Sequence, residues 1–164
     1  MNGHLKFSAK VFPVIVLLCL LFTSCKSNKH VLETKTKINL TAVDFVKSDK
    51  LSKVLDIAKA KDKLVFVDFY TDWCLPCQLM DEDVFTDPDM ADFLNDNFIN
   101  YKINAEEGGG PDLSVIFEVK AYPTLLFLDH KGRVILRKQG AAYHTELKAM
   151  GMQALSHKDF GMRE

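Results

Sequence analysis

Residues 64–77 have the sequence LVFVDFYTDWCLPC, a nearly continuous apolar run followed by two cysteines three positions apart. A short apolar run of this kind predicts a strand over 64–70 that is buried on both faces, as in a central parallel sheet. A helix is predicted to begin at Cys74 and to continue to Val84. Cys74 would then lie at the helix N-terminus, with Cys77 one turn further along on the same face.

The positions of the two cysteines suit thiol–disulfide chemistry. A thiol attacks a disulfide only as its thiolate, and the unpaired amides and dipole of a helix N-terminus lower the pKa of a cysteine placed there. Cys77 is close enough to attack the resulting mixed disulfide and release the product. Pro76 is tolerated between them because first-turn amides have no helical partner. The spacing therefore predicts a redox-active pair.

A zinc site or a structural bridge would account for the pair less well, although both stay open. Structural zinc takes four ligands, and the histidines fit no ligand spacing around this single pair (His30, His130, His144 and His157). A structural bridge across so short a loop would stabilise the fold little, because it constrains the unfolded chain little. An incidental pair of buried cysteines is the remaining alternative. We predict no metal site and no cofactor.

The flanking sequence predicts an α/β fold with a central mixed sheet between helices. A helix over 48–61 precedes the strand, and Asp87 and Pro88 are expected to cap and begin a helix that runs to about Asn97. A strand over 98–104, a flexible glycine-containing loop over 105–112 and a helix over 113–119 follow. Strands over 124–129 and 134–138 form a hairpin, and a helix over 143–156 closes the domain.

The N-terminus predicts export. Lys6 and Lys10 precede an apolar run over 11–22, which is too short to cross a bilayer and is typical of a secretory signal. A short buried helix is the alternative, against which Pro13 argues. Residues 21–25, LFTSC, resemble the lipobox of bacterial lipoproteins, in which Cys25 would be lipidated and become the first residue, although Phe22 replaces the usual leucine. Ordinary signal cleavage nearby is the other possibility.

These observations predict a signal peptide over 1–24, a polar tether over 25–43, a domain over 44–158 and a tail over 159–164. The 164-residue chain has a net charge of −1, which gives no indication of a nucleic-acid partner. Cys19 would leave with the signal and Cys25 would be lipidated. Cys74 and Cys77 would then be the two cysteines of the folded domain.

The motifs resemble those of thioredoxins over roughly 44–156. Residues 67–77 are similar to the thioredoxin active-site strand and turn, residues 122–124 (Tyr-Pro-Thr) to the cis-proline loop, and Gly140 to the glycine after the last strand. The stretch from Met80 to Asn95 is similar to the C-terminal domain of the DsbD electron transporter and to related exported lipoproteins. The resemblance implies a thioredoxin fold.

The resemblance also implies roles for individual residues. Cys74 would be the nucleophile and Cys77 the resolving cysteine. Asp68 would be a buried acid that helps to deprotonate Cys77, with a pKa raised by burial. Lys102 matches a lysine placed near that acid.

The substrate side of the site is implied in the same way. Pro123 would be cis and lie opposite the cysteines, leaving the backbone beside it, at Tyr122, able to pair with substrate. Trp73 would shield the site, although taken alone it could be a core residue, and Pro76 would belong to the same substrate-binding surface. The chain departs from the thioredoxin pattern at Leu75, between the cysteines, and at Gln78, where many thioredoxins have lysine.

The expected function is that of a thiol–disulfide oxidoreductase of the bacterial cell envelope. It would be a periplasm-facing, membrane-anchored lipoprotein that reduces or exchanges disulfides in exported proteins. A membrane transporter of the DsbD kind is the candidate electron donor. The alternatives are a thioredoxin-fold binding module without turnover and a structural lipoprotein with an inert disulfide.

Overall fold

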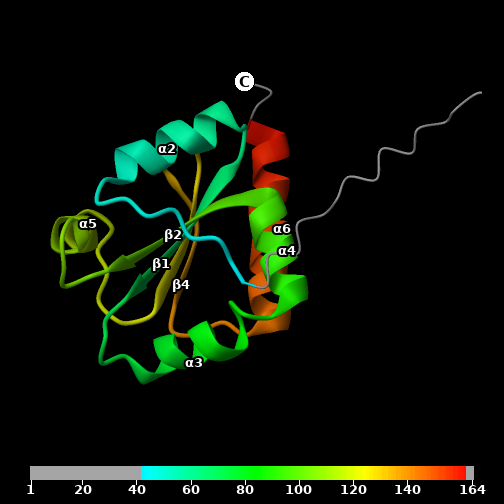
Figure 1. Cartoon of the computed structure of the whole chain (residues 1–164). Coiled ribbons are helices and arrows are strands. Elements are labelled where there is room, and N and C mark those ends of the chain that lie inside the picture. The colour runs from blue at the N-terminus through cyan, green and yellow to red at the C-terminus, as the bar shows by residue number, and fades with distance from the viewer. Residues whose placement is uncertain (1–41, 162–164) are drawn as a thin grey trace, which may run out of the picture. The chain divides into compact units, whose positions relative to one another are not determined.

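The computed structural model describes residues 42–161, with side chains to His157. The predicted signal peptide, most of the tether with Cys25, and residues 162–164 lie outside the described residues. The elements are α2 (Leu51–Ala60), β1 (Leu64–Tyr70), α3 (Leu75–Asp83), α4 (Pro88–Asn97), β2 (Phe98–Asn104), α5 (Gly110–Ile116), β3 (Thr124–Leu128), β4 (Val134–Gln139) and α6 (His144–Gly161) (Figure 1).

The four strands form one mixed sheet in the order β2-β1-β3-β4. β1 runs parallel to β2, with Tyr70 beside Asn104, and antiparallel to β3, with Phe69 beside Thr124. β3 and β4 form the antiparallel hairpin, whose register shifts between Phe127 and Leu128. The predicted arrangement, parallel strands first and an antiparallel pair last, is confirmed.

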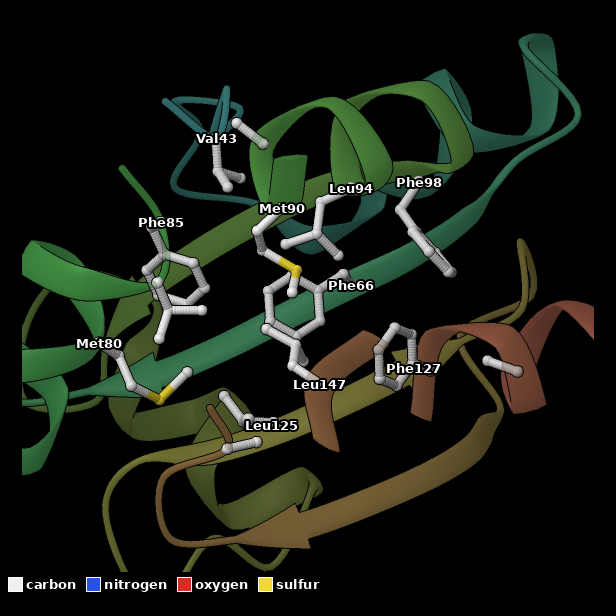
Figure 2. Close-up of a cluster of buried hydrophobic side chains, with 14 of the residues drawn as sticks. Val43, Phe66, Met80, Phe85, Met90, Leu94, Phe98, Leu125, Phe127 and Leu147 are labelled. Atoms are coloured by element: carbon white, nitrogen blue, oxygen red, sulfur yellow. The ribbon is translucent and has the colours of Figure 1, made fainter. Parts of the chain in front are cut away.

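Helices cover both faces of the sheet, and the alternation of side chains along β1 determines which residues face which helices. Phe66 points into the cluster formed with α3, α4 and α6, which Figure 2 shows around Met80, Leu94 and Leu147. Val67 points into the opposite cluster, with α2 and the end of α5. β1 is therefore buried on both faces, as its apolar run predicts.

The turn before α4 confirms the predicted helix start. Oδ1 of Asp87 accepts a hydrogen bond from the Met90 amide at 2.8 Å, and Pro88 is the first helical residue. This cap satisfies one of the amides that a helix N-terminus leaves without an internal partner. Met90 and Leu94 on the next turns are buried against the sheet.

The folded region extends past both predicted boundaries. Val43, assigned to the tether, is buried in the core, and its amide donates to the Phe85 carbonyl at 2.8 Å. Asn95 holds the same segment, because its Oδ1 accepts from the Asp44 amide and its Nδ2 donates to the Ala42 carbonyl. At the other end α6 continues to Gly161, because no glycine or proline interrupts it after its last core residue, Leu155.

Residues 108–110 were predicted to form a flexible loop, but two of the three glycines are closely packed in the structure. α5 already begins at Gly110. A Cβ atom on Gly110 would lie 1.8 Å from the carbonyl oxygen of Asn104, and one on Gly109 would lie 2.6 Å from that of Asp49. Glycine is required at these two positions because backbone segments pack closely, and composition alone does not reveal such an approach.

We therefore expect Gly110→Ala to lower the free energy of unfolding by about 3 kcal/mol or more, because the added methyl group meets rigid backbone. Gly108→Ala is the matched control. Its φ of +55° carries a left-handed penalty of about 1 kcal/mol, but no atom lies within 4 Å of the added carbon. Urea unfolding of both variants measures the difference. If the two variants lose the same free energy of unfolding, the backbone at Asn104 moves aside easily and Gly110 is not required there.

Candidate active site

Cys74 and Cys77 form a disulfide at the N-terminus of α3, with a sulfur–sulfur distance of 2.07 Å. Cys74 is the N-cap residue, and its Sγ accepts a hydrogen bond from the Cys77 amide at 3.2 Å. Its carbonyl accepts from the amides of Cys77 and Gln78, each at 3.1 Å. The predicted placement is confirmed, and the amide that contacts Sγ is the kind of donor that stabilises a thiolate.

Both cysteines are largely covered. Cys74 is 3% exposed and Cys77 is 1% exposed, so Cys74 is the more accessible of the two. The residues on either side of Cys74, Trp73 and Leu75, are more than 60% exposed. The surface next to Cys74 is therefore formed in part by these two apolar side chains, with Pro76 also exposed beside them.

Trp73 stands on the surface and is not a core residue. Its ring meets that of Tyr122 edge to face, with centroids 5.8 Å apart and an interplanar angle of 81°. Its Nε1 donates to the Glu106 carboxylate, at 3.2 Å from Oε1 and 3.1 Å from Oε2. The structure thus brings together Trp73 and Tyr122, two of the residues that the sequence predicts on the substrate side.

The cis-proline loop lies at the same end of the sheet as the cysteine turn. The peptide bond between Tyr122 and Pro123 is cis, as the resemblance implies. Thr124, the next residue, begins β3 opposite Phe69 near the end of β1, and the Pro123 carbonyl accepts from the Gly140 amide at 2.8 Å. Pro123 itself is buried, and Tyr122 is half-buried.

Asn104 is a site residue that the sequence did not predict. Its Nδ2 donates to Oδ1 of Asp72 at 3.2 Å, and its Oδ1 accepts from the Glu106 amide at 3.0 Å. Gln78 supports the same turn, because its Nε2 donates to the Asp72 carbonyl at 2.8 Å. A polar residue at the end of the strand beside Tyr70 is the signal that could have identified Asn104.

Asp68 lies in the core behind the cysteines. It is 1% exposed, so its carboxyl group is almost completely removed from water. Burial raises the pKa of Asp68 to about 6, against the opposing charge of Lys102, whose Nζ lies 3.3 Å from Oδ2. Lys102 thus lies beside Asp68, as the resemblance implies, and the direction of the pKa shift is the predicted one.

Asp68 faces the helix that carries Cys77. It shares its face of β1 with Phe66, whose cluster contains Met80 of α3. Met80 and Cys77 are the two buried residues of α3, three positions apart and thus on one face of the helix. The carboxyl group therefore lies on the side of the sheet that α3 covers with its Cys77 face.

Lys102 interacts with two carboxylates. Besides Asp68 it contacts Asp81 of α3, to which Nζ donates a hydrogen bond. Its Nζ also lies 4.6 Å from the ring centroid of Tyr70, which suits a cation–π contact. Asp81 was not predicted from the sequence, and its negative charge helps to keep the pKa of Asp68 raised.

The described part of the chain offers neither a metal centre nor a membrane span. Among residues 42–161, no group of three or more histidine, cysteine, aspartate and glutamate side chains could hold a metal ion. Within the same range, no helix is both long and apolar enough to cross a membrane.

The fold and the site together define a thioredoxin-fold domain with a redox-active Cys-x-x-Cys pair. Residues 51–155 match the model of the thioredoxin-like domain family, so the chain belongs to this family. Among solved structures, a candidate disulphide-isomerase from Bacteroides thetaiotaomicron is 37% identical, with a TM-score of 0.62, over 70% of this chain and 93% of that one. A thioredoxin from Thermus thermophilus is 25% identical, with a TM-score of 0.58, over 63% and 82%.

Similarity to DsbD is also found. The thiol:disulfide interchange protein DsbD of Salmonella typhi is 34% identical over 98 residues, which are 58% of this chain and 16% of DsbD. DsbD of Escherichia coli K12 is 31% identical over 106 residues, or 63% and 18%. The match thus spans less than a fifth of these relatives. The chain therefore contains a thioredoxin-like domain with a Cys-x-x-Cys pair that resembles part of DsbD.

Proposed function

We propose that this protein reduces or exchanges disulfides in exported proteins of the bacterial cell envelope. The observation that carries the proposal is the position of Cys74, whose Sγ accepts the Cys77 amide at the start of α3 while a buried acid lies on the sheet face beneath that helix. The similarity to DsbD, which is named as a thiol:disulfide interchange protein, supports the same chemistry. The N-terminal signal and lipobox patterns support the location.

The reaction begins with the reduced protein. The Cys74 thiolate attacks one sulfur of the partner disulfide, a mixed disulfide forms, and the other partner sulfur leaves as a thiolate. The Asp68 carboxylate accepts the proton of the Cys77 thiol, which its raised pKa allows near neutral pH. The Cys77 thiolate then attacks Cys74, and the partner leaves with two electrons gained. The protein is left oxidised, so a membrane transporter of the DsbD kind is proposed to reduce it again.

The reduction potential tests the proposed direction. Leu75 and Pro76 place no charge and no side-chain donor between the cysteines, so the thiolate receives little stabilisation beyond the helix terminus. A less stabilised thiolate means a less stable reduced form. We expect a Cys74 pKa closer to thioredoxin's ~7 than to DsbA's ~3.5. The potential should then lie at about −200 to −270 mV, well below DsbA's ~−120 mV.

Equilibration with glutathione buffers of graded ratio measures this potential. The fractions of oxidised and reduced protein are read after acid quenching and thiol alkylation. Leu75→His serves as a comparison, because a histidine beside Cys74 adds a donor and should raise the potential. A wild-type value near that of DsbA would make the protein a disulfide donor and would overturn the reductase proposal.

Anchoring is a separate proposal, because Cys25 lies outside the described residues. With Cys25 intact, we expect the protein to fractionate with membranes and to partition into detergent. Cys25→Ser should abolish lipid attachment while the folded domain retains its disulfide chemistry. Mass spectrometry of the mature N-terminus decides the matter, and an unmodified Cys25 in the mature protein would exclude the lipoprotein assignment.

A further inference from the structure

We propose that Trp73 and Glu106 form a recognition site for a lysine or arginine next to the disulfide of the partner protein. This inference rests on the proposed function, since it concerns the partner that reacts at Cys74. It narrows the substrate class to disulfides flanked by a cationic side chain.

The exposed indole of Trp73 is held in place. Its ring meets that of Tyr122 in a T-shaped contact, and its N–H donates to Glu106, yet 68% of the residue stays exposed beside Cys74. A large aromatic surface that is fixed but uncovered loses little conformational freedom when a partner binds. Any disulfide that reaches Cys74 brings its neighbouring side chains onto this surface.

The Glu106 carboxylate adds a negative charge beside the ring. Both of its oxygens lie within hydrogen-bond distance of Nε1, and its backbone amide is held by the Asn104 side chain. The negative charge is therefore fixed at the edge of the indole. Donation of the indole N–H to an anion makes the ring more electron-rich, and indole is the aromatic group that binds cations best. One partner cation can thus meet the ring face and the carboxylate together.

Two further acidic side chains lie on the same two segments as Trp73 and Glu106. Asp72 and Glu107 are exposed and are both held by Asn104, because Asp72 accepts from Asn104 Nδ2 and the Glu107 amide donates to the Asn104 carbonyl at 3.3 Å. Lys102 is 14% exposed and is already paired with Asp68 and Asp81. Residues 72 and 106–107 therefore contribute three acidic side chains around Trp73. Lys120, in the segment before Tyr122, is an exposed cation on the same side, and the three acidic side chains outnumber it. This side favours cationic partners and disfavours anionic ones.

The experiment uses two peptides that contain one intramolecular disulfide and differ only in lysine or glutamine beside the attacked cysteine. Reduction by the reduced protein is followed by acid quenching and mass spectrometry. At about 20 mM salt we expect the lysine peptide to react about five- to tenfold faster than the glutamine peptide. At about 0.5 M salt the ratio should fall below about twofold, because exposed charges are then screened.

Glu106→Gln should reduce the low-salt ratio to about twofold or less. Asp56→Asn removes one negative charge from the exposed surface of α2 and should leave the ratio at its wild-type value. If the wild type reduces both peptides equally fast at low salt, or if Glu106→Gln keeps the full ratio, the recognition proposal is wrong while the proposed function stands. If neither peptide is reduced, the proposed function itself fails.

Discussion

Cys74→Ser is expected to reduce turnover to the uncatalysed background when dithiothreitol supplies electrons for the reduction of an accessible protein disulfide. A serine hydroxyl does not ionise near neutral pH and cannot form the mixed disulfide through which exchange proceeds. The N-terminus of α3, which stabilises the Cys74 thiolate in the wild type, should stay folded in the variant because serine is also a good N-cap. The loss would therefore report the chemistry of the sulfur and not a failure to fold.

Cys77→Ser is the matched variant, and its expected phenotype is different. Cys74 still attacks the partner, but no second thiol resolves the product, so mixed disulfides should accumulate and be released by added reductant. Full turnover by Cys74→Ser would show that the assigned nucleophile is wrong. A wild-type protein that forms mixed disulfides without turnover would instead be a binding module that holds its partner.

The elements that could be predicted from the sequence are those determined by residues close together along the chain. The apolar run of β1, the cap at Asp87 and the hairpin at 130–132 each depend on neighbouring residues, and all three elements are found. The position of Cys74 at the start of α3 is local in the same sense, because a buried strand followed by a short turn brings it there.

The residues that were missed depend on distant contacts. Asn104 reaches Asp72 only because the parallel register places it beside Tyr70. Asp81 reaches Lys102 only because α3 lies on the face of the sheet from which the Lys102 side chain projects. Gly109 and Gly110 were interpreted as flexible because composition does not show which backbone lies against them. Val43 looked like tether because one apolar residue in a polar stretch forms no period, although it packs in the core.

The burial of the Asp68 carboxyl group lowers the stability of the folded protein. The proposed role of Asp68 in proton transfer explains why an acid is kept at this position. The pKa of Asp68 is about 6 in the folded protein, against about 4 for an aspartate in the unfolded chain. Between about pH 4 and pH 6 the carboxyl group is therefore protonated in the native state and mostly ionised in the unfolded state. The native state then binds more protons than the unfolded state, so stability falls as the pH rises from about 4 to above 6. The penalty at neutral pH is on the order of 3 kcal/mol, since each pKa unit is worth about 1.4 kcal/mol.

Asp68→Asn is therefore expected to stabilise the oxidised protein at pH 7.5 by on the order of 2–3 kcal/mol, and to change its stability little at pH 4. At pH 4 the wild-type carboxyl is already neutral, so the two side chains are nearly equivalent there. Lys102 keeps Asp81 as its partner, so the substitution does not leave it unpaired. Urea unfolding at the two pH values measures the effect. Asp56→Asn on exposed α2 is the control, with a change below about 0.5 kcal/mol at either pH.

The same Asp68 variant should be slower in catalysis. Asparagine cannot accept the proton of the Cys77 thiol, so the resolving step slows and mixed disulfides persist longer than in the wild type. A gain in stability together with a loss in the resolving step would identify Asp68 as a residue kept for proton transfer. If Asp68→Asn is less stable than the wild type at pH 7.5, the attraction between Asp68 and Lys102 outweighs the burial of the carboxylate, and the proposed cost of the buried acid is wrong.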